Sequence, residues 1–167
     1  MVIRDETRRD HEAVRELNEA AFESDAEARL VDALREQATP VVSLVAEEDS
    51  AIVGHILFSP VTLTDHESLG IMGLAPMAVA PSRQRQGIGS SLVRAGLDRC
   101  RDLGAGAVVV LGHPEFYPRF GFVPSTRFDI GCEYDVPEDV FMVTELKPGF
   151  LRGTSGTIRY HPAFGEL

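Results

Sequence analysis

The stretch that decides the fold, residues 73–122, reads GLAPMAVAPSRQRQGIGSSLVRAGLDRCRDLGAGAVVVLGHPEFYPRFGF. It begins with a short apolar run over residues 74–79 that contains Pro76. Because proline cannot donate to a strand ladder, a strand here should carry a bulge or a broken edge. Further on, residues 107–111 form a continuous apolar run, which is typical of a strand buried on both faces.

A glycine-containing turn and a helix connect these two strands. Residues 80–86 form the turn, Gly87-Ile88-Gly89 follows it, and apolar residues then recur with helical spacing from about Ser90 to Leu103. This order of elements directs backbone N–H groups and the positive end of a helix at one place, where a phosphate or pyrophosphate can bind. Glycines there leave the backbone open to a ligand.

Two familiar anion-binding loops are excluded by the residues that follow Gly89. A Walker loop needs a lysine next, whereas this chain has Ser90 and Ser91. A dinucleotide-binding fingerprint needs a third glycine, and its position holds Leu92.

Two motifs in this stretch resemble those of the Gcn5-related N-acetyltransferase (GNAT) superfamily. Residues 84–89, Gln-Arg-Gln-Gly-Ile-Gly, are similar to the superfamily's pyrophosphate loop, Gln/Arg-x-x-Gly-x-Gly/Ala. Residues 117–122, Tyr-Pro-Arg-Phe-Gly-Phe, are similar to its Tyr-x-x-x-Gly-Phe motif after the fifth strand. The whole segment looks closest to small prokaryotic predicted N-acetyltransferases with a His-Pro-x-x-Tyr-x-Arg-Phe-Gly-Phe sequence, and the clear match covers about residues 70–123.

The resemblance implies an α/β (α+β) GNAT fold over residues 1–167 as a single domain. We expect a mixed central sheet of six to seven strands, flanked by about four helices and splayed between strands 4 and 5. The implied reaction is direct attack of a primary amine on the thioester of acetyl-CoA, with acetyl-CoA (coenzyme A) as cofactor. The expected cofactor-binding residues are Met77, Ala78, Val79, Gln84, Arg85, Gln86, Gly87, Ile88, Gly89 and Ser90.

Tyr117 matches the superfamily's general acid, the group that protonates the departing thiolate. A phenol with a pKa of about 10 stays protonated at neutral pH and can therefore donate. A packed aromatic in a short helix is the alternative reading of Tyr117. Arg119 either touches the cofactor phosphates or caps that short helix. The aromatic residues around them, Phe116, Phe120 and Phe122, are expected in the core.

The acceptor side is less defined by the sequence. By the resemblance, Phe22, Glu23 and Glu27 are candidates for binding the acceptor, with core packing as the alternative for Phe22 and helix capping as the alternative for Glu27. His113 is a further candidate for binding the acceptor. The group that removes the amine proton stays open among Glu27, His113, Glu115 and a water chain. The sequence His113-Pro114-Glu115 is not a metal-binding pattern, and no metal is expected.

Outside the central stretch, residues 2–3 are expected to start a strand, and Thr7 to Asp10 has the form of a capping box that opens a helix to about Phe22. Residues 24–27 have the form of a second box. Residues 41–47 and 51–63 then predict a hairpin, with His55 as a hydrogen-bonded core residue, and residues 69–79 a fourth strand.

Three further strands are expected after Phe122, over residues 127–132, 140–146 and 156–160. The first two should extend the sheet beyond the fifth strand. The third either covers a sheet edge or packs on a partner chain, which leaves a homodimer open.

Composition limits the partners and the compartment. The net charge of −10 disfavours nucleic acid and anionic membranes, and it suits either simple solubility, a halophilic source or a cationic amine acceptor. Two isolated cysteines, Cys100 and Cys132, and the absence of a signal peptide or membrane span favour the cytoplasm. The acceptor is either a small molecule or a protein. Two other readings stay open: a non-catalytic acyl-CoA-binding module of this fold, and an unrelated nucleotide-binding α/β domain.

Overall fold

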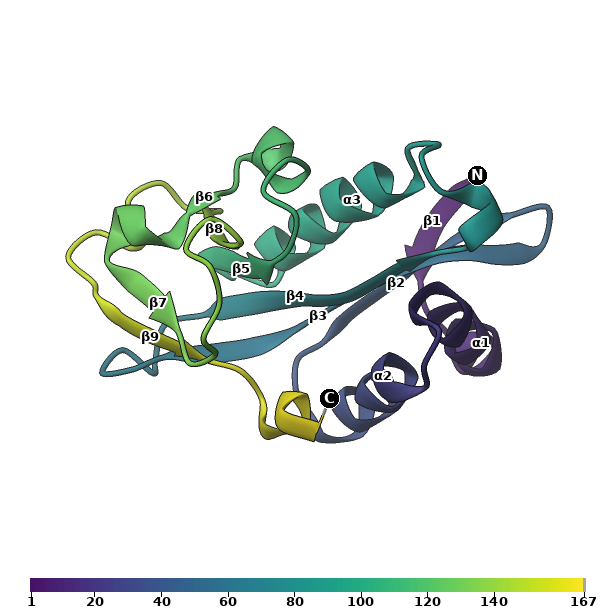
Figure 1. Cartoon of the computed structure of the whole chain (residues 1–167), viewed down its shortest axis with the longest axis horizontal. Coiled ribbons are helices and arrows are strands. Elements are labelled where there is room, and N and C mark those ends of the chain that lie inside the picture. The colour runs from purple at the N-terminus through teal and green to yellow at the C-terminus, as the bar shows by residue number, and fades with distance from the viewer. Residues whose placement is uncertain (167) are drawn as a thin grey trace.

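The computed structural model describes residues 1–166, in which a mixed β-sheet lies between α-helices (Figure 1). The α-helices are α1 (His11–Phe22), α2 (Ala26–Gln37) and α3 (Ile88–Asp102). The strands are β1 (Val2–Asp5), β2 (Val42–Glu48), β3 (Ala51–Leu63), β4 (Ile71–Val79), β5 (Ala107–Leu111), β6 (Val123–Pro124), β7 (Ile130–Cys132), β8 (Phe141–Glu145) and β9 (Gly156–Arg159). Short 3-10 helices are η1 (Arg8–Asp10), η2 (Pro81–Arg83), η3 (Tyr117–Phe120), η4 (Ser125–Phe128) and η5 (Pro162–Glu166).

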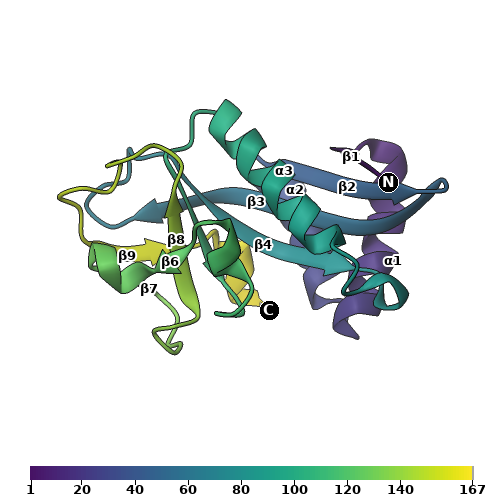
Figure 2. The same cartoon turned by 90° about the horizontal axis from the view of Figure 1, so that it is seen from above.

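The main sheet has the strand order β1-β2-β3-β4-β5-β8-β6, and within it only β4 and β5 pair in parallel. Helix α3 covers one face, whereas α1 and α2 cover the other (Figures 1 and 2). Each face has its own apolar core. Leu92 and Val93 of α3 pack on the first face, and Val31 and Leu34 of α2 pack on the second. The expected mixed, splayed sheet is therefore present, with seven strands in the main strand order. Three α-helices flank it among residues 1–166, rather than the four expected.

Strands β4 and β5 separate part-way along their length. They pair from Ile71 with Ala107 to Leu74 with Val110, and the pairing stops there. On the other side of β4, its register with β3 shifts between Ile56 and Phe58, opposite the part of β4 that contains Pro76. This register shift is the irregularity predicted from Pro76. The sheet splays at the same place, just beyond Leu74.

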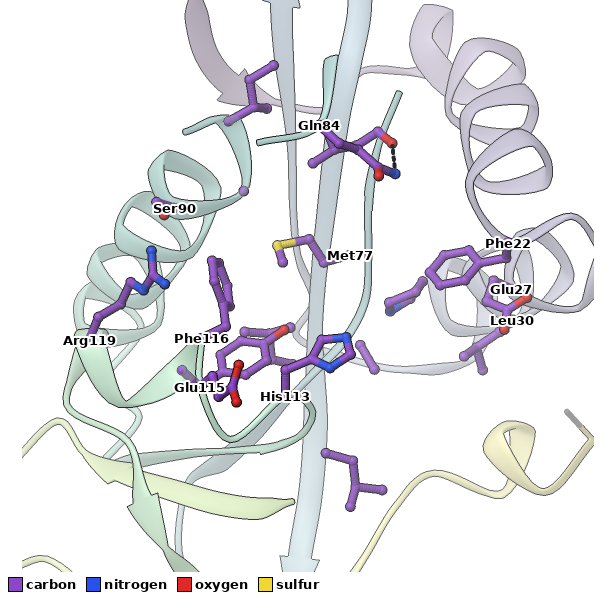
Figure 3. Close-up of a pocket in the computed structure, with 18 of the residues that line it drawn as sticks. Phe22, Glu27, Leu30, Met77, Gln84, Ser90, His113, Glu115, Phe116 and Arg119 are labelled. Carbon is purple, nitrogen blue, oxygen red and sulfur yellow. Dashed lines mark hydrogen bonds between the residues drawn. The ribbon is translucent and has the colours of Figure 1, made fainter. Parts of the chain in front are cut away.

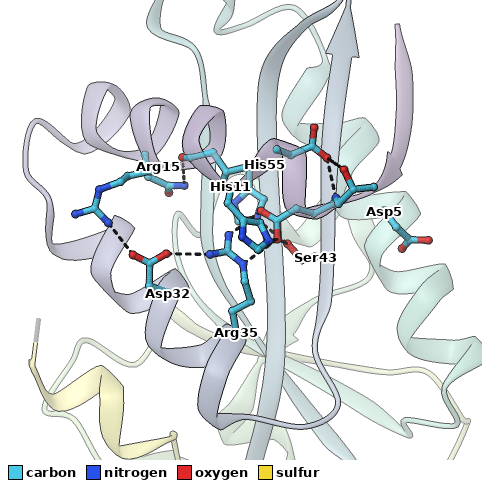
Figure 4. A network of polar contacts seen from close by, with 12 residues as sticks. Asp5, His11, Arg15, Asp32, Arg35, Ser43 and His55 are labelled. Carbon is cyan, nitrogen blue, oxygen red and sulfur yellow. Dashed lines mark hydrogen bonds and ion pairs between the residues drawn. The ribbon is translucent and has the colours of Figure 1, made fainter.

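A polar network fastens α1 and α2 to the start of the sheet (Figure 4). Arg35 of α2 donates to Glu6 at 2.7 Å and to Asp32 at 2.9 Å, and Asp32 also accepts from Arg15 of α1 at 2.6 Å. Beside it, Ser43 Oγ lies 2.9 Å from Nε2 of His55, which is fully buried. Burial lowers the pKa of His55 to about 4, so this residue is a neutral core histidine, as its apolar neighbours predicted.

The predicted element boundaries hold with small shifts at the helix starts. Thr7 N–H donates to the Asp10 carboxylate at 2.7 Å, so the first capping box is present, although it opens η1 and α1 follows. Helix α3 begins at Ile88, earlier than the predicted Ser90, because the glycine turn already has a left-handed residue at Gly87 and the helix starts directly after it.

The strand predicted over residues 127–132 does not extend the main sheet, and that prediction is wrong. Only Ile130–Cys132 is extended, and it pairs in parallel with β9, which itself pairs with the end of β3. Strand β8 instead extends the main sheet by pairing with β5, and β6 pairs with the other edge of β8. Strand β3 is long enough to pass the edge of β4, and its free end at Thr62 and Leu63 accepts β9.

Candidate active site

A cavity of about 1340 Å³ lies where β4 and β5 separate. Single-ligand pockets have roughly 300–1,000 Å³, so this one has room for two ligands. Figure 3 shows its residues arriving from opposite sides, with Phe22 and Glu27 from the α1–α2 region and His113 and Phe116 from the chain after β5. The full lining consists of Phe22, Glu27, Leu30, Leu74, Ala75, Pro76, Met77, Val79, Arg83, Gln84, Arg85, Gly87, Ile88, Gly89, Ser90, Leu111, His113, Glu115, Phe116, Tyr117, Arg119, Tyr134, Val136, Tyr160, Phe164 and Gly165.

The turn between β4 and α3 has the backbone shape of an anion-binding loop. Arg85 has a φ of 65° and Gly87 a φ of 86°, so two left-handed residues bend the chain into the start of α3. Such bends turn successive N–H groups toward the same side. The first turn of α3 contains no acidic residue to oppose an anion. Arg83 at the end of η2 adds a positive charge to the same part of the cavity and pairs with Glu48.

Two residues of the predicted cofactor set lie elsewhere. Ala78 is buried, at 3% exposure, and does not line the cavity, whereas its neighbours Met77 and Val79 do. Gln86 also lies outside the lining, and its side chain accepts a hydrogen bond from Arg83 Nε at 3.1 Å. The alternation of strand residues explains Ala78, since successive side chains of β4 point to opposite faces.

Tyr117 lies at the start of η3, with its ring among other aromatic rings and its side chain in the cavity lining. Its ring centroid is 5.0 Å from that of Phe116 and 5.6 Å from that of Phe122, both edge-on. Burial raises the pKa of Tyr117 to about 12. The hydroxyl therefore stays protonated well above neutral pH and can donate a proton.

Arg119 stacks on its neighbour rather than capping η3 with a hydrogen bond. Its guanidinium lies 4.8 Å from the ring centroid of Phe116, and both residues line the cavity (Figure 3). The core prediction holds fully for Phe122, which is 1% exposed, whereas Phe116 and Phe120 are only partly buried.

Three of the acceptor candidates line the cavity, whereas Glu23 is exposed and lies outside the lining. The structural alternatives for two of the three are wrong. Phe22 is 38% exposed, so it is not a core residue. Glu27 does not complete a capping box: at the start of α2 the Ala26 N–H donates to Ser24 Oγ at 3.1 Å, while Glu27 Oε1 is buried and has no hydrogen-bond partner among the described residues. His113 is exposed at the end of β5.

Five residues of the cavity lining were not predicted from the sequence. Leu30, Tyr134, Val136, Tyr160 and Phe164 also line it. Four of them come from the last 34 residues, where short strands give weak periodicity. The one available signal was the presence of Tyr134, Tyr160 and Phe164 outside the apolar run of β8.

Residues 1–166 contain neither a cluster of metal ligands nor a helix that could span a membrane. No three side chains of the metal-binding types gather closely enough to hold a metal ion. None of the helices described there has the length and apolar character needed to cross a bilayer.

Comparison with known proteins agrees with this geometry. Residues 11–122 match the model of the Acetyltransferase (GNAT) family. The chain is 39% identical over 168 residues to the uncharacterized N-acetyltransferase YhbS of Escherichia coli K12, with all of both chains covered. It is 40% identical over 131 residues to the uncharacterized N-acetyltransferase YjhQ of the same strain, covering 75% of this chain and 72% of that protein.

Two solved structures are similar over nearly the whole chain. The crystal structure of Escherichia coli YhbS in complex with CoA has a TM-score of 0.93 and 38% identity, covering 99% of this chain and 92% of the other. A GNAT family acetyltransferase from Brucella melitensis in complex with acetyl-CoA has a TM-score of 0.81 and 38% identity, covering 98% and 97%. These matches exclude an unrelated nucleotide-binding domain. The chain belongs to the GNAT family of acetyltransferases.

Proposed function

We propose that this protein transfers the acetyl group of acetyl-CoA to the nitrogen of a primary amine. The observation that carries the proposal is that one cavity contains an anion-binding loop, a strand edge without a partner and a protonated tyrosine. The complexes of the two similar proteins, with CoA in YhbS and with acetyl-CoA in the Brucella protein, support the choice of cofactor.

The residues of the loop fit the pyrophosphate of coenzyme A. The left-handed residues Arg85 and Gly87 lead directly into α3, whose N-terminal N–H groups attract anions. Gly87 leaves open space, since a Cβ built on it would meet no atom within 4 Å. Arg83 and Arg85 supply cationic charge beside it. We assign the pyrophosphate to the N–H groups from Arg85 to Ser90.

The edge of β4 fits the extended, amide-containing arm of the cofactor. From Ala75 to Val79 this edge faces β5 without pairing to it. An extended ligand can add to such an edge through main-chain hydrogen bonds, as a peptide would. We assign the edge at Met77 and Val79 to this role, with their N–H groups as the candidates for stabilising negative charge on the reacting carbonyl oxygen.

Bound acetyl-CoA supplies an acetyl group activated as a thioester. The amine nitrogen forms a bond to the carbonyl carbon, the carbon–sulfur bond breaks, and the sulfur leaves as a thiolate. Tyr117 donates its phenolic proton to that sulfur, a role consistent with a pKa that burial raises to about 12. The ammonium proton of the acceptor must leave before attack, and Glu27, His113, Glu115 and a water chain stay as the candidate routes.

The competing function is a module that binds acyl-CoA without turnover. Calorimetry with acetyl-CoA, followed by free-thiol release with a panel of amines, distinguishes the two. We expect binding together with amine-dependent thiol release. Binding without thiol release with any amine would favour the non-catalytic module, and absence of binding would contradict both. The cytoplasmic location, the single domain and a homodimer stay predictions.

A further inference from the structure

The half of the cavity that faces away from the loop has an apolar surface, which we call the acceptor wall. It consists of Phe22, Leu30, Tyr134, Val136, Tyr160 and Phe164. Tyr134, Tyr160 and Phe164 form a continuous aromatic cluster. Their ring centroids are 5.9 Å apart for Tyr134 and Tyr160 and 5.0 Å apart for Tyr160 and Phe164. Burial raises the pKa of both tyrosines, so the wall carries no charge of its own.

Two segments that are distant in the sequence build the acceptor wall. Helix η5, which carries Phe164, lies against α2, which carries Leu30 (Figure 1). Strand β9 anchors the segment that leads into η5 by pairing with the end of β3. A ligand on the acceptor wall would therefore contact both α2 and the C-terminal segment. The cavity that they line has a size typical of small-molecule sites.

Glu27 is the charged exception on this side. No arginine or lysine comes from α2, residues 134–136 or residues 160–165 in the lining, and Glu27 takes part in no ion pair among the described residues. Figure 3 shows Arg119 on the side of Ser90, across the view from Glu27. The other two arginines of the lining, Arg83 and Arg85, belong to the segment between β4 and α3. The cavity is thus cationic where the phosphates are proposed to bind and anionic on the acceptor side.

The Glu27 carboxylate lacks a donor. Its Oε1 atom is buried and accepts no hydrogen bond from any described residue. A buried acceptor that has lost water without gaining a partner costs roughly 1–3 kcal/mol, and more when charged. Native proteins retain few such groups, and each one needs an explanation. Glu27 as a whole is only half-buried and lines the cavity, so the N–H donors of a cation bound there can reach its carboxylate.

We propose that the acceptor is a small amine with an apolar body, whose positive charge pairs with Glu27 while the body packs on the acceptor wall. This inference rests on the proposed function and adds the substrate class to it. An amine that also carries a carboxylate beside its amino group should be rejected, because that anion would be brought near Glu27 without a cation to balance it.

The test uses 2-phenylethylamine as the probe, with 3-phenylpropionate as an anion of the same shape. Binding is measured by calorimetry on the full chain with saturating CoA. We expect the amine to bind and the carboxylate not to bind. Glu27→Gln should weaken amine binding at least tenfold, whereas Glu36→Gln, which removes the same charge from an exposed position of α2, should not.

A second readout separates binding from folding. Because Glu27 has an unpartnered buried oxygen, Glu27→Gln should leave the unfolding temperature unchanged or raise it, while CoA affinity stays the same. A structural role for Glu27 would instead lower that temperature. Phe22→Ala should weaken binding of 2-phenylethylamine about tenfold and leave CoA affinity unchanged, since it removes apolar contact only.

Each remaining outcome is decisive. Unchanged amine affinity in Glu27→Gln, equal binding of the carboxylate, or absence of amine binding while CoA binds would overturn the inference and leave the proposed function standing. If CoA itself fails to bind, the proposed function falls, and the inference falls with it.

Discussion

The ring of Tyr117 occupies the space that a side chain at Gly112 would fill. A Cβ built on Gly112 would overlap the Tyr117 ring, although the backbone there is not left-handed. Glycine is therefore required at this position for space. The end of β5 and the start of η3 meet through this contact, which fixes where the tyrosine hydroxyl lies in the cavity.

Gly112→Ala should displace Tyr117 and lower kcat about 10- to 100-fold, the range that general acid catalysis supplies. Acetyl-CoA affinity should change little, because the loop lies elsewhere. Gly131→Ala is the matched control, since a Cβ on Gly131 meets no atom within 4 Å. Steady-state kinetics check the prediction, and equal kcat in wild type and Gly112→Ala would contradict it.

Tyr117→Phe removes one hydroxyl and should also lower kcat about 10- to 100-fold, with acetyl-CoA affinity within a few-fold of wild type. The pH profile adds a second test. Burial raises the pKa of Tyr117 to about 12, and a general acid works in its protonated form. Wild-type kcat should therefore show no alkaline decline caused by Tyr117 below about pH 10. An alkaline decline below about pH 10 that disappears in Tyr117→Phe would contradict the raised pKa of Tyr117.

Gly87→Ala tests the loop against a control with the same backbone strain. Gly87 has a φ of 86° and Gly104, at the other end of α3, a φ of 89°, and neither has a neighbour within 4 Å of a built Cβ. Either alanine should cost roughly 1–2 kcal/mol of stability. Only Gly87→Ala should weaken acetyl-CoA binding, as measured by calorimetry, because its backbone lies in the proposed pyrophosphate site. Equal affinities in the two variants would place the site elsewhere.

Gly89→Val should weaken acetyl-CoA binding at least tenfold while the fold survives. A Cβ on Gly89 would be in ordinary contact with Met77, at 3.6 Å, and Phe116, at 3.7 Å, so the protein itself can accept it. The added bulk would instead occupy space that the cofactor needs at the first turn of α3. Calorimetry measures the loss, and circular dichroism checks the fold. Wild-type affinity in a folded variant would exclude the cofactor from this turn.

Asp10 should make stability depend on acidic pH. Arg4 donates to its carboxylate at 2.7 and 3.0 Å, and these hydrogen bonds, with that of Thr7, hold the pKa of Asp10 well below its usual value. A lowered folded-state pKa stabilises the fold above the unfolded pKa of about 3.9, and the contribution is lost as pH falls below about 5.

Asp10→Asn should therefore lower the free energy of unfolding by about 1–3 kcal/mol at neutral pH, and the difference should shrink toward about pH 3. Urea unfolding across this range measures it. Asp5→Asn removes the exposed pair with Arg99 and should have a much smaller effect. A constant difference at all pH values would show that Asp10 acts through packing alone.

The sequence by itself determined the strand, turn, helix and strand around residues 73–122. Those features depend on contacts between near neighbours: the 3.6-residue period of α3, the break at Pro76 and the glycine turn. The Tyr117 motif is also local, and the structure brings it into the same cavity as the loop. One local prediction was wrong. The spacing of Glu27 from Ser24 fits a capping box, but the folded chain does not form it.

Only the tertiary structure decided the acceptor side. Tyr160 and Phe164 reach the cavity because β9 pairs with the free end of β3, nearly one hundred residues earlier in the chain. Strand β7 pairs with β9 for the same reason, and so leaves the main sheet. Such pairings depend on which strand edges remain free once the central sheet has formed. Oε1 of Glu27 likewise becomes a buried oxygen without a hydrogen-bond partner only in the folded chain. The energy of a buried polar group depends on the groups that long-range folding places around it.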